Sequence, residues 1–129
     1  MSAPRRRQFI TPSNSAAHYK STGPEIWDDL DGNVDILISA VGTGGTISGA
    51  AKYLKEKNKS IKIIAVEPKS SAVLSGCKAG SHRIQGIGAG FVPEILDLSL
   101  IDEIVTVDDE DAYYYGREFS KTEGVLVGI

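Results

Sequence analysis

The sequence predicts an α/β fold with three layers, in which flanking helices cover an open, mostly parallel sheet of about four strands. Short apolar runs that suit buried strands alternate with segments of helical periodicity; the expected strands lie at residues 35–40, 61–66, 104–107 and 125–129. The first two strands flank a helical segment, which is the order of a right-handed parallel crossover unit. A length of 129 residues, with 41% hydrophobic and 24% charged residues, suits one globular domain.

The chain begins with prolines and small polar residues that favour turns. They predict an extended lead-in over residues 1–20 with little core of its own, and we expect the α/β domain over residues 21–129. The first helix of the domain is predicted to start with a capping box, in which Thr22 caps the helix and Glu25 reaches back to it. Gly32 is expected to end this helix.

A glycine-rich turn follows the first predicted strand and precedes a helix expected over residues 47–57. The turn consists of Gly42, Thr43, Gly44, Gly45 and Thr46. Glycines let the backbone approach a ligand closely, and the first amides of a helix lack partners and lie at the positive end of its dipole. The turn therefore predicts a phosphate cradle, with two threonine hydroxyls as further donors. The alternative is an ordinary strand-to-helix turn without a ligand.

The spacing of the glycines limits the kind of phosphate. A nucleoside triphosphate loop needs a lysine directly after the glycines, whereas the first lysine here is Lys52. A dinucleotide fingerprint needs a third glycine where this chain has Ile47, although Glu67 stands where a ribose-binding acid is expected. A nucleotide-binding Rossmann domain is therefore a disfavoured alternative. Uncharged donors suit a phosphate that serves as an anchor, since each hydrogen bond to a charged group contributes roughly 1.5–3 kcal/mol.

A second glycine-rich segment, residues 85–91, carries three glycines at alternate positions. A segment with so few side chains packs poorly, so we interpret it as backbone that another group approaches closely; a flexible surface loop is the alternative. His82 is interpreted as a surface histidine and Cys77 as an exposed or half-buried thiol.

The last third of the chain predicts a helix that begins at Asp108 or Asp109 and ends at Gly124. Acidic residues in its first turn suit the helix dipole. The three tyrosines at 113–115 point in three directions, so at most two of them can face a core.

Composition and charge exclude several classes of partner. The formal net charge is −3, so no basic field attracts nucleic acid. No apolar run reaches the length of a membrane span, and the start lacks a signal-peptide core. The single cysteine cannot form an internal disulfide, which fits a reducing compartment. We therefore expect a cytoplasmic protein, and we predict no metal site.

Several segments, taken in order, resemble cysteine synthase, or O-acetylserine sulfhydrylase, of the tryptophan-synthase-β-like group of pyridoxal-phosphate enzymes. These segments are residues 17–19, 22–27, 41–49, 66–68, 71–76 and 84–93. The match extends over nearly all of residues 8–129, which makes it far more specific than the glycine turn alone.

The resemblance implies a function: β-replacement of O-acetylserine by sulfide, dependent on pyridoxal 5′-phosphate, which gives L-cysteine and acetate. By resemblance, the turn from Gly42 to Thr46 would hold the phosphate of the cofactor. The substrate-side backbone would be that of Gln85, Gly86, Ile87 and Gly88. The family's full-length enzymes also lead us to expect a homodimer and a possible docked tail of serine acetyltransferase.

The chain departs from the family pattern at the chemical centre. The family's Schiff-base lysine lies in an N-terminal part without a counterpart here, and neither Lys20 nor Lys52 matches it. The serine that accepts the pyridine nitrogen follows the segment matching residues 127–129. We therefore assign no catalytic residue and expect the central part of a larger domain, truncated at both ends and inactive alone.

Two alternatives remain beside the cysteine synthase assignment. The first is a non-catalytic fragment or pseudo-enzyme that binds only a phosphate or a partner. The second is an enzyme like cystathionine β-synthase; the resemblance disfavours it, because that enzyme has a bulkier and more polar segment where this chain has Ala89-Gly90-Phe91.

Overall fold

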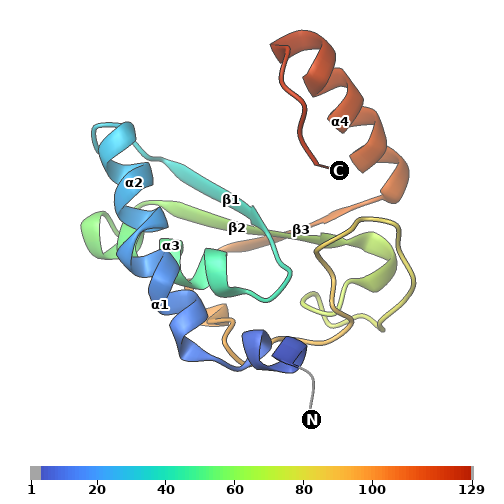
Figure 1. Cartoon of the computed structure of the whole chain (residues 1–129), viewed down its shortest axis with the longest axis horizontal. Helices are drawn as coiled ribbons and strands as arrows, with labels where there is room; N and C mark the ends of the chain where they lie inside the picture. Colours follow the sequence, from blue (N-terminus) through green and yellow to red (C-terminus); the bar gives the residue numbers. More distant parts are fainter. Residues whose placement is uncertain (1–3, 129) are drawn as a thin grey trace.

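A computed structural model describes residues 4–128 of the chain. Its centre is a parallel sheet of three strands in the order β1-β2-β3 (Figure 1). The strands are β1 (Ile36–Ala40), β2 (Lys62–Pro68) and β3 (Glu103–Val107). Ile38 pairs with Ile64, and Ala65 pairs with Ile104. The predicted α/β class with an open parallel sheet is confirmed, with three strands where about four were expected.

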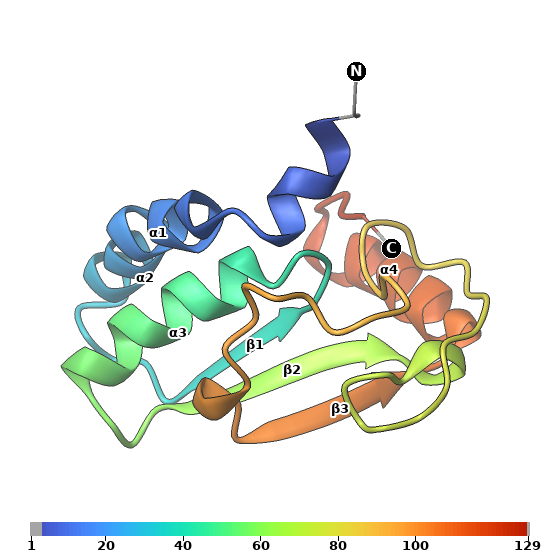
Figure 2. The same cartoon turned by 90° about the horizontal axis from the view of Figure 1, so that it is seen from below.

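Helix α3 (Gly45–Lys57) connects β1 to β2 and supplies the main buried face. Its Ile47, Ala51 and Leu54 are buried and belong to one apolar cluster with Ile63 and Ala65 of β2. This spacing is the apolar stripe of a helix that packs on a sheet. As a result, the first turn of α3 lies beside the carboxyl end of β1, as the crossover unit predicted (Figure 2).

The predicted extended lead-in over residues 1–20 is wrong for the described residues. They form a 3₁₀ helix, η1 (Pro4–Phe9), and helix α1 (Pro12–Lys20). None of the residues of α1 is fully buried, so the sequence carries no apolar stripe that would reveal the helix. Proline at its first position suits a helix start, because the missing N–H has no partner there in any helix.

Helix α2 (Thr22–Asp29) follows α1 almost directly, and its predicted capping box is absent. The residue before the helix is Ser21, which makes no side-chain cap. The hydroxyl of Thr22 instead lies 2.8 Å from Nδ1 of His18 on α1. The Thr22 side chain, which the local pattern predicted as the helix cap, therefore contacts His18 instead.

The chain between β2 and β3 is mostly irregular. It contains only two short 3₁₀ helices among its described residues, η2 (Lys69–Ser71) and η3 (Leu98–Leu100). The second glycine segment lies in this connection, on the side of the sheet where the strands end (Figure 2).

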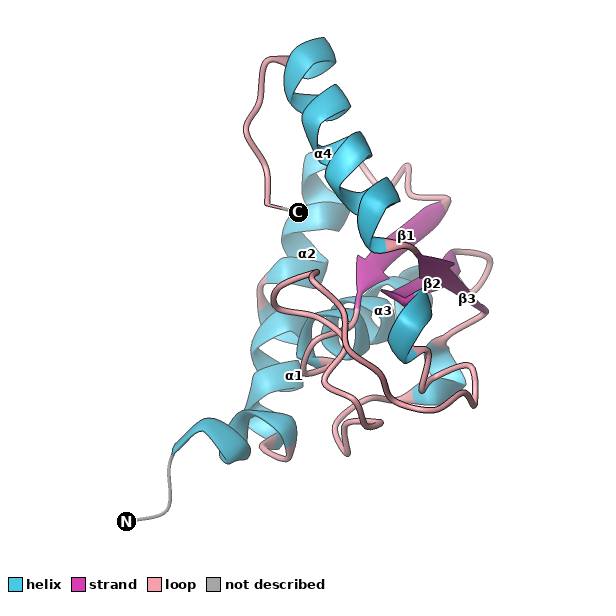
Figure 3. Ribbon diagram, turned by 90° about the vertical axis from the view of Figure 1, so that its right-hand side faces the viewer, coloured by secondary structure: helices cyan, strands magenta, loops and turns pink. Residues whose placement is uncertain are grey.

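Helix α4 (Asp109–Glu123) begins and ends as predicted. Gly124 closes it in the left-handed region with a φ of 69°, which glycine adopts without strain. The helix stands apart from the layer of α1–α3, and none of its described residues is fully buried (Figure 3). Tyr114 and Tyr115 are exposed, so these rings are not core.

The predicted strand at 125–129 is wrong for its described part. Residues 125–128 are irregular, and Leu126 is 91% exposed; Ile129 lies outside the described residues. An apolar run forms a strand only where a neighbouring strand accepts its hydrogen bonds, and none lies beside this run among residues 4–128. Helices α1–α3 lie on one face of the sheet, while Ile38 on β1 and Val105 on β3 are exposed. No helix in the described part of the chain has the length and apolarity to cross a membrane.

The packing of α1 on α3 gives a stability prediction. A Cβ built on Gly49 would lie 2.2 Å from the carbonyl oxygen of Ser15. We expect Gly49→Ala to push α1 away and to lower the free energy of unfolding by about 1–3 kcal/mol in urea denaturation. Gly116→Ala on α4 is the matched control, since nothing lies within 4 Å of its Cβ position. Equal stability of the two variants would contradict this packing.

The link between α3 and β3 gives a pH prediction. Lys55 donates to the carboxylate of Asp102, and the backbone N–H of Ile63 also donates to it. Together they hold the pKa of Asp102 below its ordinary value of 3.8. A lowered folded-state pKa stabilises the protein above the ordinary value, and this stability is lost as the pH falls through the lowered one.

We therefore expect Asp102→Asn to be less stable than the wild type near pH 7, with a difference that shrinks below about pH 4. Urea midpoints measured across this range test it. Parallel pH profiles for the two proteins would contradict the assignment.

Candidate phosphate-binding site

The first glycine turn lines an open hollow at the amino end of α3. Gly44 is the residue before the helix and adopts a φ of 84°, in the region that favours glycine. The hollow has a volume of about 230 Å³, and its lining residues are Ala40, Gly42, Thr43, Gly44, Thr46, Ile47, Gly86 and Ile87. The structure thus brings the two glycine segments together at one edge of the sheet.

The backbone amides of this turn are available as donors. Among the described residues, no acceptor engages the N–H groups of Gly42, Thr43, Gly44 or Thr46. The N–H of Gly45 lies 3.3 Å from Oγ1 of Thr43. Unpaired amides at a helix start, together with the helix dipole, favour an anion.

Two side chains of α1 contact the threonines of the turn. Asn14 Nδ2 donates to Thr43 Oγ1 at 3.0 Å, and Nε2 of His18 lies 3.3 Å from Thr46 Oγ1. The sequence interpretation missed both residues, because it placed them in an extended lead-in. Their four-residue spacing puts them on one face of a helix, but that signal is useful only once the helix is known.

The second glycine segment reaches the hollow with only part of its predicted residues. Gly86 and Ile87 line it, whereas Gln85 is exposed and does not. Gly88 instead binds the end of β1, where its N–H donates to the carbonyl oxygen of Val41 at 3.0 Å.

Gly42 and Gly86 approach each other so closely that a side chain on Gly42 has no room. A Cβ built there would lie 2.3 Å from the carbonyl oxygen of Gly86. The alternate glycines predicted that another group approaches this backbone closely. In the structure that group is the backbone of the first glycine turn.

His82 holds the second segment from the other side. Its Nε2 lies 2.9 Å from the carbonyl oxygen of Gly88, and its Nδ1 accepts from the N–H of Ile84 at 3.3 Å. The ring is half-buried, and both nitrogens are engaged within the segment. The arrangement makes His82 a structural residue of this loop, and the thiol of Cys77 is exposed.

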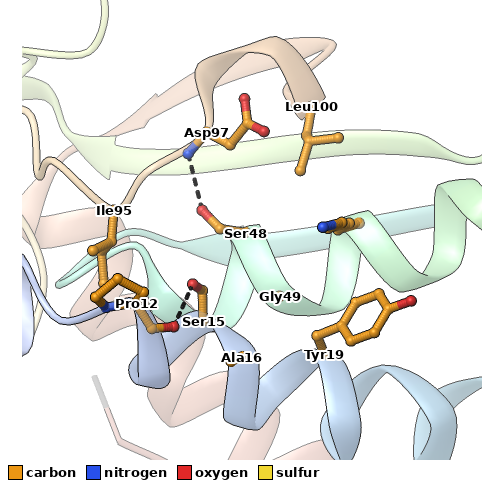
Figure 4. Close-up of a pocket in the computed structure, with 10 residues that line it drawn as sticks. Pro12, Ser15, Ala16, Tyr19, Ser48, Gly49, Ile95, Asp97 and Leu100 are labelled. Carbon is orange, nitrogen blue, oxygen red and sulfur yellow. Dashed lines mark hydrogen bonds between the residues drawn. The ribbon is translucent and has the colours of Figure 1, made fainter.

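A larger groove of about 390 Å³ lies between α1, α3 and the segment before η3 (Figure 4). In it, Ser48 Oγ accepts from the N–H of Asp97 at 3.0 Å, which ties the end of the loop to the first turns of α3. The residues of the glycine turn, Gly42 to Thr46, do not line this groove. The bond between Ser48 and Asp97 therefore positions the loop, and the groove is separate from the hollow.

A sequence model of the family described as "Pyridoxal-phosphate dependent enzyme" matches residues 5–129. The chain belongs to this family. It is 55% identical to a cysteine synthase of Buchnera aphidicola subsp. Schizaphis graminum, over 95% of this chain and 41% of the relative. It is 47% identical to cysteine synthase A of Escherichia coli, with the same shares covered. The resemblance inferred from the motifs is confirmed, and it favours pyridoxal phosphate over a nucleotide.

A solved structure gives the same result for the fold. Cysteine synthase from Entamoeba histolytica superposes with a TM-score of 0.92 at 53% identity, over 95% of this chain and 36% of the other. The chain thus spans less than half the length of the relatives it matches.

The residues of the hollow fit the phosphate end of such a cofactor. Free amides and two hydroxyls converge on a space that a side chain at Gly42 would disturb. No lysine or arginine lines the hollow among the described residues, so the hydrogen bonds of uncharged groups would carry the binding. Those residues also contain no group of three or more His, Cys, Asp or Glu that could hold a metal ion.

The contact between Gly42 and Gly86 generates a binding prediction. In Gly42→Ala the new methyl group must displace Gly86, because the two atoms cannot stay 2.3 Å apart. We expect the affinity for inorganic phosphate, measured by calorimetry, to fall by at least about tenfold, or about 1.4 kcal/mol. Gly128→Ala, with nothing within 4 Å of its Cβ position, is the control. Unchanged affinity in Gly42→Ala would show that phosphate does not bind in this hollow.

Proposed function

We propose that the chain binds pyridoxal 5′-phosphate in the hollow and contributes this site to a cysteine synthase, which replaces the acetate group of O-acetylserine by sulfide to give L-cysteine and acetate. The observation that carries the proposal is the set of unpaired amides of Gly42, Thr43, Gly44 and Thr46, together with two threonine hydroxyls, around one hollow at the start of α3. The identity of 55% to a cysteine synthase supports the choice of reaction.

The cradle would act through the phosphate alone. The amides from Gly42 to Thr46 and the dipole of α3 would bind its oxygens, and the hydroxyls of Thr43 and Thr46 would add two donors. Several hydrogen bonds to a charged group, at roughly 1.5–3 kcal/mol each, suffice to hold a dianion without a cation. The phosphate would then serve only as an anchor, so its charge would not have to be neutralised by a cation.

The second glycine segment would limit where the rest of the cofactor and the substrate lie. Gly86 presents backbone without a side chain at the edge of the hollow, so a flat ring or a small substrate can approach it closely. When bound, the cofactor supplies the electron sink for replacement at the β-carbon of an amino acid. The protein supplies placement, and Gly86 and Ile87 would form one wall.

A non-catalytic role of the isolated chain is the second candidate. No lysine lines the hollow among the described residues, so the chain would hold pyridoxal phosphate without a covalent bond. Incubation with O-acetylserine, sulfide and the cofactor should then give no cysteine. Cysteine formation by this polypeptide alone would refute the second candidate and support a complete enzyme.

The wider assignments rest on resemblance. We propose a homodimer for the complete protein, an interaction with a serine acetyltransferase tail, and a cytoplasmic location. The names of the relatives, which are cysteine synthases, support small-molecule substrates. Size-exclusion chromatography of the complete protein would test the dimer.

Titration calorimetry tests the cofactor assignment directly. We expect pyridoxal 5′-phosphate to bind. Pyridoxal and NAD should bind at least tenfold more weakly, because pyridoxal lacks the phosphate and NAD does not fit the glycine spacing. Thr46→Val should weaken binding of pyridoxal 5′-phosphate about fivefold to tenfold, since one hydrogen bond to the phosphate is lost.

Thr122→Val is the matched control, because that hydroxyl donates only within α4, to the carbonyl oxygens of Glu118 and Phe119. Equal affinity for pyridoxal and its phosphate would refute the cradle. Tighter binding of NAD would favour the nucleotide alternative.

A further inference from the structure

Glu67 is a buried carboxylate outside the hollow. It lies near the end of β2, is only 1% exposed, and forms no ion pair with any cation of the described chain. Burial of an unpaired carboxylate destabilises a protein unless hydrogen bonds satisfy its oxygens. The partners of Glu67 therefore indicate why the acid is present.

Both oxygens of Glu67 bind one turn of the following loop. Oε2 accepts from the N–H of Leu74 at 2.8 Å, while Oε1 accepts from the N–H of Ser75 at 2.9 Å and from its hydroxyl at 2.6 Å. The turn continues through a hydrogen bond from Gly76 N–H to the carbonyl oxygen of Val73. The carboxylate on β2 thus caps the turn that follows this strand, and its hydrogen bonds are charge-assisted.

The capped turn and the second glycine segment line the same small cavity. A cavity of only about 10 Å³ separates them, and it is lined by Glu67, by Leu74 of the turn, by Gly42 of the cradle and by Gly88. The turn and the segment therefore face each other across one narrow space. Gly88 itself lies close to His82 and Pro68, and the turn lies across the cavity from it, near the point where its N–H binds Val41.

We propose that Glu67 is a positioning residue for the phosphate site. It fixes the turn at Leu74 and Ser75, the turn supports the second glycine segment, and that segment keeps Gly86 against Gly42 as the wall of the hollow. The inference rests on the proposed function for its effect on pyridoxal phosphate. Its effect on the loop is independent of any ligand.

Glu67→Gln tests this role, because an amide of the same shape replaces one acceptor oxygen by a donor and loses at least one of the bonds. We expect hydrogen exchange of residues 84–91 in the ligand-free protein to accelerate about tenfold, while exchange of residues 47–57 on α3 stays within about twofold. The amide resonance of Gly88 should shift, and the affinity for pyridoxal 5′-phosphate should fall about tenfold.

Two further variants complete the design. Ser75→Ala removes only the hydroxyl bond and should accelerate exchange of residues 84–91 about threefold; it decides the case if Glu67→Gln does not fold. Glu103→Gln is the matched control, since this strand residue pairs with Lys62 at the surface and should leave residues 84–91 unchanged.

Unchanged exchange of residues 84–91 in both Glu67→Gln and Ser75→Ala would overturn the proposal. Equal acceleration over residues 84–91 and α3 would also overturn it, because the residue would then support only the fold as a whole. If the wild type does not bind pyridoxal 5′-phosphate, the proposed function fails, while the exchange measurements still decide the role of Glu67.

Discussion

The close approach of Gly42 and Gly86 is the constraint on which the site depends. A Cβ on Gly42 would lie 2.3 Å from the carbonyl oxygen of Gly86, so this approach requires glycine at position 42, while Gly86 adopts a φ of 85° that favours glycine. The hydrogen bond from Gly88 N–H to the carbonyl oxygen of Val41, the residue after β1, joins the two segments a second time. The floor of the cradle and its wall are therefore joined through backbone alone, which fixes their separation more firmly than side-chain contacts would.

Glycine has a second use on α3, where it lets another helix come close. Positions 45 and 49 face α1, and a Cβ on Gly45 would lie 2.1 Å from Oδ1 of Asn14. This approach brings Asn14 to Thr43, whose oxygen accepts from the Asn14 amide and from the N–H of Gly45. With its oxygen occupied as an acceptor, the hydroxyl of Thr43 keeps its proton free to donate into the hollow. Packing between the helices thus orients a donor of the cradle.

The sequence predicted those parts of the molecule that carry a strong local pattern. The apolar stripe of α3, the runs of β1, β2 and β3, and Gly124 after α4 each specify an element without help from the rest of the fold. Helix α1 has no such stripe, because it is held by its backbone contact to Gly49 rather than by buried side chains. The run at 125–128 has the pattern of a strand but no neighbour to pair with, and a single sequence does not show neighbours.

The same division applies to the site. The turn from Gly42 to Thr46 was predicted from spacing, because an anion site at a helix start is local. Asn14, His18 and the turn capped by Glu67 come from other segments, and their contacts appear only in three dimensions. Gln85 was expected beside the hollow from resemblance, yet it is exposed, because the chain forms a turn at Gln85 and Gly86 in which Gly86 adopts a φ of 85°.

A cradle without a cation also explains why the supports gather on the wall rather than on the phosphate. A lysine would attract any anion over several ångströms, including the carboxylates of substrates, whereas amides and hydroxyls act only at hydrogen-bond distance and geometry. In the proposed site, such donors would select the phosphate but would fix only one end of the cofactor. The other end would be placed by Gly86 and Ile87, and a small shift of a positioning group is costly for a reaction. His82 and Val41 bind that segment, and Glu67 binds the turn across the cavity from it, which is the distribution expected when placement, rather than strength of binding, limits the site.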